Sequence, residues 1–210
     1  MTDKTKEKLE NDRAFLSDKV KYIAGVDEVG RGPLAGPVVC CAVIMPLDDE
    51  NAVDGVDDSK KVSVKKRESL YETLKEKAIA YKICRIEPLE IDEINILEAT
   101  KKCMKICIEG LSVKPDLVLV DAVKLDIPYK TQAIIKGDAK SYNIGAASII
   151  AKVFRDKLMD EYDEIYPDYG FANNKGYGTK VHINALKEKG ACPIHRKTFI
   201  KNFSAKKEND

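Results

Sequence analysis

Four acidic residues of this chain stand where short apolar stretches end, and they are Asp27, Glu28, Asp121 and Asp138. Two carboxylates about 4 Å apart repel each other by roughly 4 kcal/mol at an effective dielectric constant of 20, so gathered acids are tolerated only when protonated or bound to cations. Ligation by carboxylate oxygens alone favours Mg²⁺ or Mn²⁺ over zinc. Because two such ions clamp a phosphodiester for in-line displacement, the four acids together predict phosphodiester hydrolysis.

Each acid alone has a plainer explanation as a turn or cap residue, so the prediction depends on the set. Neighbouring residues of a regular strand point to opposite faces, and Asp27 and Glu28 can share one ligand only if the strand twists or ends there. Asp156 is the main rival for the fourth position. It lies in a predicted helix, where its alternative role is to pair with Arg155 or Lys152.

The element that must position the first two acids is a glycine-rich hairpin over residues 22–44. Two apolar runs rich in β-branched residues flank a segment that holds Gly30, Gly32, Gly36 and two prolines, which is the pattern of strand, turn and strand. Glycine lets another molecule approach the backbone closely. The hairpin therefore predicts a site beside the turn, and an ordinary turn with two surface acids explains the stretch equally well.

The remaining elements predict a mixed sheet with helices on its faces. A run of strands followed by alternating helices and strands is typical of that architecture, in which strand ends can meet at one point. Ser63 and Thr179 are suited to begin helices. The expected strands are 78–86, 116–121 and 130–138, the expected helices are 3–17, 64–74, 91–111 with a joint near Asn95, 144–166 and 180–189, and 168–178 is expected to be a loop.

Composition sets broad limits on the class of protein. With 210 residues and 44% hydrophobic composition, the chain is long enough for one α/β domain. Its 36 basic and 35 acidic residues give a net charge of +1, which neither favours nor excludes a polyanionic partner. The chain has no run suited to span a bilayer and no signal peptide, so we expect a cytoplasmic protein with no membrane partner. Its six cysteines show no C-x-x-C spacing and are expected to be reduced structural thiols.

The run DEVGRGPLAGPV at residues 27–38 resembles the signature of ribonuclease HII. Further motifs resemble the same family in the same order, and together they extend from residue 22 to residue 199. They are DSKKVS at 58–63, VDA at 120–122, KGD at 136–138, AASIIAKVFRD at 146–156, KGYGT at 175–179 and HRKTF at 195–199.

The resemblance implies an α/β protein with a ribonuclease H-like mixed sheet flanked by helices and a small C-terminal helical extension. The chain is then divided into an N-terminal helical segment at 1–18, a catalytic domain at 19–166, an extension that contributes to substrate binding at 167–203, and a polar tail at 204–210. A monomer is expected. A sliding clamp stays open as a partner, although the tail shows no clear clamp-binding motif and so does not support it.

The resemblance also implies an endonuclease that uses Mg²⁺ or Mn²⁺. It would hydrolyse the RNA strand of RNA·DNA hybrids and incise 5′ of single ribonucleotides embedded in duplex DNA, by two-metal-ion catalysis that leaves 3′-OH and 5′-phosphate ends. The catalytic, metal-binding acids of the family fall on Asp27, Glu28, Asp121 and Asp138.

The expected substrate-binding residues surround those acids. Gly30, Arg31 and Gly32 resemble the loop that grips the ribonucleotide, which suits the small 2′-OH because reading it needs backbone groups with no Cβ in the way. Tyr177 resembles the tyrosine that packs on the nucleotide across the RNA-to-DNA junction, and its alternative role is a loop aromatic that covers the core. Contacts to the rest of the substrate, including its phosphates, are expected from Ser59, Lys60, Ser148 and Lys152; for any one lysine the alternative is a solvated surface role.

Two positions depart from the family pattern. Ala122 stands where the family commonly has glycine, and Gly145 where it commonly has serine, so a looser start of the long helix is expected at Gly145. Two rival functions remain. One is a protein that binds hybrids without cutting them, and the other is a nuclease of the same fold that cuts ribose-free DNA junctions, against which the Arg31 loop argues.

Overall fold

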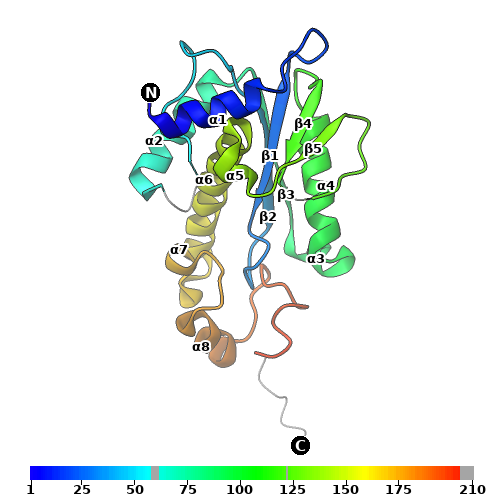
Figure 1. Ribbon diagram of the computed structural model, residues 1–210. Helices are drawn as coiled ribbons and strands as arrows, with labels where there is room; N and C mark the ends of the chain where they lie inside the picture. Colours follow the sequence, from blue (N-terminus) through cyan, green and yellow to red (C-terminus); the bar gives the residue numbers. More distant parts are fainter. Residues whose placement is uncertain (58–61, 122, 204–210) are drawn as a thin grey trace, which may run out of the picture.

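A computed structural model describes residues 1–57, 62–121 and 123–203 of the chain. Within these residues the chain forms a five-stranded mixed sheet in the order β3-β2-β1-β4-β5 (Figure 1). Strand β1 pairs antiparallel with β2 and parallel with β4, so the predicted mixed architecture is confirmed. The strands are β1 at Ile23–Val29, β2 at Val38–Ile44, β3 at Ala80–Ile86, β4 at Leu117–Val120 and β5 at Thr131–Ala133.

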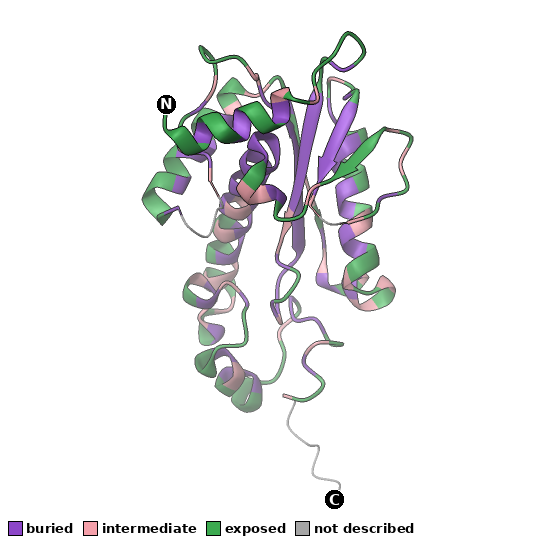
Figure 2. Ribbon diagram, in the orientation of Figure 1, coloured by how far each residue is buried: buried purple, intermediate pink, exposed green. Residues whose placement is uncertain are grey.

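The central strands are covered on both faces, which explains their continuous apolar runs. All seven residues of β2 are buried, and Figure 2 shows the middle of the sheet as buried while the edge strand β5 is exposed. Alternate residues of β2 enter different cores. Cys41 packs in a cluster that includes Ile149 of the long helix, and Cys40 packs in a second cluster with Cys103 and Met104.

Helices form the two outer layers. The helices α1 (Asp3–Arg13), α2 (Val64–Lys77), α5 (Gly137–Lys140) and α6 (Tyr142–Ile165) lie on one side of the sheet, and α3 (Pro88–Ile94) and α4 (Ile96–Glu109) lie on the other (Figure 1). Helix α6 approaches β1 very closely. A Cβ atom on Gly25 would lie 2.2 Å from the backbone carbon of Asn143, so only glycine fits at that position.

Several predicted boundaries are confirmed. Asn95 has a φ of 66° and separates α3 from α4, and its side chain accepts hydrogen bonds from the first turn of α4. Thr179 caps α8 (Lys180–Lys189) by accepting from the backbone N–H of His182. Ser63 is the N-cap residue of α2, as expected, although its side chain makes no capping hydrogen bond.

Two segments differ from the expected structure. The expected strand at 130–138 ends at Ala133, and Lys136 in the left-handed region (φ 57°, ψ 50°) leads into α5. Asp138 therefore lies in a helical turn and not at a strand end. The expected loop at 168–178 contains the 3₁₀ helix η1 (Pro167–Tyr169) and the short helix α7 (Phe171–Asn174). Among the described residues, the structure has no helix both long and apolar enough to cross a membrane.

Candidate active site

The four acids belong to three segments that meet at one end of β1 and β4. The two strands are parallel, and their last register pair joins Val26 to Val120, so Asp27 and Asp121 both follow that pair. Helix α5 packs against the same place, because a Cβ atom on Gly137 would lie 3.4 Å from the Cβ of Asp121. Parallel strands and one helical turn thus bring distant parts of the chain together.

Burial and mutual repulsion dominate the electrostatics of this site. Burial raises the pKa of Asp27 well above its usual value, and the charges of Glu28 and Asp138 raise it further, while a hydrogen bond with Ser148 opposes them. Burial also raises the pKa of Glu28, which its ion pair with Arg31 counteracts and the charge of Asp121 reinforces. Since each acid interacts with another, the four carboxylates form one electrostatic group.

The four carboxylates do not surround one common point. In the part of the chain that the structure describes, no three His, Cys, Asp or Glu side chains are arranged to hold a metal ion. The strand explains this. Asp27 lies opposite Cys41 on the α6 face and Glu28 lies opposite Cys40 on the α4 face, because adjacent residues of a strand alternate. The predicted convergence on a common ion is therefore not preformed.

The donor set nevertheless fits a hard divalent cation. All four residues offer carboxylate oxygens, which suit Mg²⁺ and Mn²⁺. The raised pKa of Asp27 and that of Glu28 reflect charges that burial and neighbouring carboxylates disfavour, and a cation would relieve both effects.

The glycine-rich loop between β1 and β2 lies beside the acids. Gly30 has a φ of 90°, and a Cβ atom there would lie 2.2 Å from the Nε of Arg155, so the position requires glycine. A Cβ atom on Gly32 would lie 3.6 Å from the ring of Tyr177. Tyr177 is 47% exposed, and the Arg31 side chain is 43% exposed and lies 3.3 Å from Glu28 Oε1. The structure thus brings the predicted loop, the predicted tyrosine and one acid together.

Two buried arginines hold this loop, and neither was among the predicted site residues. The guanidinium of Arg155 donates to the backbone oxygens of Ala35, Pro37 and Lys175 at 2.9 to 3.1 Å. That of Arg196 donates to the oxygens of Gly30, Arg31 and Gly36 at 2.5 to 3.0 Å.

Burial lowers the pKa of Arg155 to about 10 and that of Arg196 to about 9. Both side chains are fully buried, which arginine rarely is. The available signal was their place in the motifs at 146–156 and 195–199.

A histidine pair ties the Tyr177 loop to the C-terminal segment. His182 Nδ1 lies 2.9 Å from the backbone oxygen of Tyr177, the two Nε2 atoms of His182 and His195 are 2.9 Å apart, and His195 Nδ1 accepts from the backbone N–H of Cys192. This pattern assigns one N–H to each ring, with His195 donating to His182. Burial, and then the neighbouring histidine, lower the pKa of His195 to about 4. Both rings are therefore neutral at pH 7.

The other predicted residues are distributed around the site. Ser148 is buried and hydrogen-bonds to Asp27. Lys152 donates to both carboxylate oxygens of Asp156, at 2.5 and 2.7 Å, so Asp156 has the helical partner that its alternative role predicted. Ser59 and Lys60 lie outside the described residues, as does Ala122.

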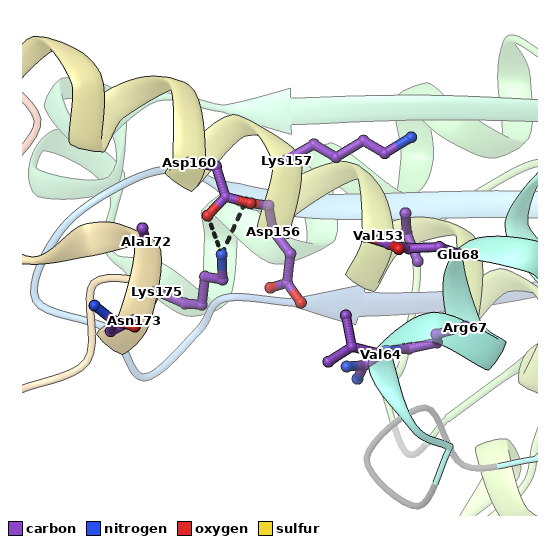
Figure 3. A pocket seen from close by; sticks show the side chains of 10 residues that line it. All are labelled: Val64, Arg67, Glu68, Val153, Asp156, Lys157, Asp160, Ala172, Asn173 and Lys175. Atoms are coloured by element: carbon purple, nitrogen blue, oxygen red, sulfur yellow. Dashed lines mark hydrogen bonds and ion pairs between the residues drawn. The ribbon is translucent and has the colours of Figure 1, made fainter.

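A separate pocket lies between α2, α6 and α7. Asp156, Lys175 and Asp160 are among its lining residues, and Figure 3 shows Lys175 turned toward Asp160, with which it forms an ion pair. The rival acid Asp156 therefore belongs to a different cluster, in which lysines compensate its charge.

A model of the family described as Ribonuclease HII matches residues 24–202. The chain belongs to the ribonuclease HII family. Ribonuclease HII of Enterococcus faecalis is 56% identical over 179 residues, which are 85% of this chain and 69% of the relative. Ribonuclease HII of Ruminiclostridium cellulolyticum is 53% identical over 193 residues, or 91% of this chain and 75% of the relative.

Solved structures of two related enzymes have a fold similar to that of this chain. The ribonuclease H2 of Pyrococcus horikoshii superposes with a TM-score of 0.71 at 30% identity, over 85% of this chain and 93% of that one. Ribonuclease HII from Archaeoglobus fulgidus, solved in a complex with PCNA, gives 0.71 at 29% identity, over 84% and 94%. Ribonuclease HII enzymes are endoribonucleases that act on the RNA of RNA·DNA hybrids, so the chain belongs to a family of hydrolases.

Proposed function

We propose that this chain is a divalent-metal-dependent endonuclease that cuts the RNA strand of hybrids and incises 5′ of single ribonucleotides in duplex DNA. The observation that carries the proposal is the juxtaposition of four electrostatically interacting acids with Tyr177 and a glycine loop that is exposed at Arg31 and Gly32. The products are a 3′-OH end and a 5′-phosphate end.

Asp27, Glu28, Asp121 and Asp138 would hold Mg²⁺ or Mn²⁺. Such ions activate water and stabilise the leaving oxygen of a phosphodiester. Because Asp27 and Glu28 lie on opposite faces of β1, their side chains must turn toward the end of the strand to bind the same metal ion. Ser148 donates its hydroxyl to Asp27 and thereby orients that carboxylate.

The Gly30–Gly32 loop is the proposed ribose reader. Arg196 fixes the backbone of this loop at Gly30 and Arg31. Gly32 is exposed and has no side chain, so its backbone groups are open to a 2′-OH, which is small and both donates and accepts. Arg31 pairs with Glu28, so a substrate that engages Arg31 also changes the surroundings of a metal ligand. Tyr177 supplies an aromatic face and a hydroxyl above Gly32.

Basic and hydroxyl side chains are the proposed contacts to substrate phosphates. Lys152 takes this role by exchanging its Asp156 partner for a phosphate oxygen, and Ser59 and Lys60 are proposed on the family motif alone. Phosphate contacts position a duplex without reading its sequence, and affinity from them falls steeply with salt. The PCNA complex of the Archaeoglobus fulgidus relative supports testing a sliding clamp as a protein partner.

The test is cleavage of a DNA duplex that contains one ribonucleotide. In Mg²⁺ or Mn²⁺ we expect a single incision on its 5′ side, no cut in the all-DNA duplex, and no cut in EDTA. Cleavage of the ribose-free duplex at the same rate contradicts the proposal. Persistent, salt-sensitive binding of the hybrid without turnover in either metal would instead support a non-catalytic binding protein, which the lack of a preformed ligand cluster among the described residues keeps as the second candidate.

A further inference from the structure

The N-terminal helix α1 presents an unusual buried face. Its buried residues are Thr5, Lys8, Leu9 and Asp12, spaced as one stripe of a helix, and only one of them is apolar. Lys8 is 1% exposed and Asp12 is 0% exposed. Buried charges are costly unless they are paired and hydrogen-bonded, so this stripe is explained by what it contacts.

Two members of the stripe, Lys8 and Asp12, contact the segment around Asp138. Thr5 instead accepts from the backbone N–H of Gly55, and Lys8 also lies 3.8 Å from Asp57 Oδ1. The Lys8 ammonium donates to the backbone oxygen of Asp138 at 2.6 Å. One turn later, the Asn11 side chain donates to the backbone oxygen of Lys140 at 3.0 Å. Helix α1 thus holds α5 at its beginning and at its end.

Asp12 connects α1 to the start of α6 by further hydrogen bonds. Its Oδ2 accepts from the Ser141 hydroxyl at 3.1 Å and from the backbone and side-chain N–H groups of Asn143 at 2.9 Å. The carboxylate therefore lies at the N-terminus of α6, where a negative charge is favourable. Asn143 in turn accepts from the backbone N–H of Met45, so the junction between α5 and α6 is fixed to the sheet.

Helix α5 needs this support. It has four residues, and a single helical turn is unstable alone because nucleation is costly. It follows the short exposed strand β5 and a left-handed Lys136.

Gly145 makes room for the Lys8 ammonium. A Cβ atom at Gly145 would lie 3.1 Å from Lys8 Nζ and 3.2 Å from the backbone oxygen of Asp138. Glycine here stands where serine is common in the family, and the space that it leaves is used by the lysine. The looser helix start expected at Gly145 stays a prediction.

We propose that Lys8 is a positioning residue that holds Asp138 in place to bind a divalent cation. The inference rests on the proposed function, because it assumes that Asp138 is a metal ligand. Lys8 acts through the backbone of that residue and touches neither substrate nor metal. Outer partners that orient a metal ligand are typically worth 10-fold to 100-fold in metal affinity.

The test is titration of the full chain with MnCl₂ in the absence of substrate, by calorimetry, alongside cleavage as a function of Mn²⁺ concentration. For K8M we expect Mn²⁺ affinity to fall about 10-fold, with cleavage largely restored at saturating Mn²⁺. Hydrogen exchange at residues 137–143 should become faster. The matched control is K6M, on the exposed side of the same helix, which should change none of these readouts.

Two further variants separate the possible failures. N11A removes an exposed contact to α5 and should fold even if K8M does not; we expect about a threefold loss of Mn²⁺ affinity, the cost of one hydrogen bond. D138N tests the assumption about the ligand. If D138N loses Mn²⁺ binding while folded K8M and N11A bind as the unaltered chain does, the Lys8 inference alone is overturned. If D138N also binds Mn²⁺ normally, the ligand assignment is wrong as well.

Discussion

At the scale of single residues, the identity of the fourth acid is the sharpest question. Asp138 lies among the coupled carboxylates, whereas Asp156 is paired with Lys152 in a separate cluster. We predict that D138N lowers the cleavage rate at least about 100-fold, beyond the usual effect of an outer-shell change. D156N should keep most activity, since an i,i+4 ion pair is worth about 0.3–0.5 kcal/mol. Full activity of D138N with loss in D156N would transfer the ligand role to Asp156.

Gly30 gives a second prediction at this scale, because the chain offers a matched control. Gly30 and Gly190 both have positive φ, but a Cβ atom on Gly30 meets Arg155 while one on Gly190 meets no atom within 4 Å. Gly190 has a φ of 80° and a ψ of −168°, a region that is essentially restricted to glycine, so G190A should cost about 1–3 kcal/mol of unfolding free energy from backbone strain alone. G30A should cost more and should also lower kcat/KM on the single-ribonucleotide duplex. Equal losses of stability and equal kinetics in the two variants would refute the claim that Arg155 packs on the loop.

At the scale of elements, buried arginines join loops that are distant in the sequence. Arg155 on α6 satisfies three backbone oxygens from two loops. We predict that R155M destabilises the fold by about 3–5 kcal/mol, since it leaves buried carbonyls without donors. R85M, which removes an exposed pair with Glu87, should cost about 0–1 kcal/mol. Chemical denaturation measures both, and similar losses would contradict this role of Arg155.

The histidine pair predicts how the stability of the C-terminal extension at residues 167–203 depends on pH. The pKa of His182 and that of His195 are lowered in the folded chain, His195 to about 4. Their contribution to the free energy of unfolding is therefore complete above the unfolded pKa of about 6.5. It is lost as the pH falls toward 4, because the unfolded chain then binds more protons. H195Q should flatten the dependence of Tm on pH over this window. An unchanged slope would show that the pair does not titrate on unfolding.

Sequence patterns predicted the elements whose determinants are local. The apolar runs around Gly30, the cap at Thr179 and the joint at Asn95 are set by residues a few positions apart. The helical turn at Asp138 was missed because its backbone accepts a hydrogen bond from Lys8 of α1, 130 positions away, which no local pattern reveals. The buried arginines were missed for the same reason, since the carbonyls that accept from Arg155 at Ala35 and Pro37 lie 120 and 118 positions away.

At the scale of the whole molecule, the sheet brings the acids to one end, while α6 and the C-terminal segment carry the arginines that hold the glycine loop between β1 and β2 (Figure 1). The family motifs named the four acids, and their roles at this end of the sheet stay a prediction. The strand period predicts opposite faces for Asp27 and Glu28 unless the strand twists or ends, and the structure keeps both residues inside a regular β1 on opposite faces. The arrangement predicts that cation binding, and not folding alone, completes the site.

The most direct measurement is the anomalous scattering of Mn²⁺ in crystals of the chain grown or soaked in MnCl₂. We expect density for Mn²⁺ at the end of β1, with ligand oxygens from Asp27, Asp121 and Asp138 and with Glu28 turned toward them. Manganese bound at Asp156, or no ordered manganese at concentrations that support cleavage, would contradict the assignment of these four acids.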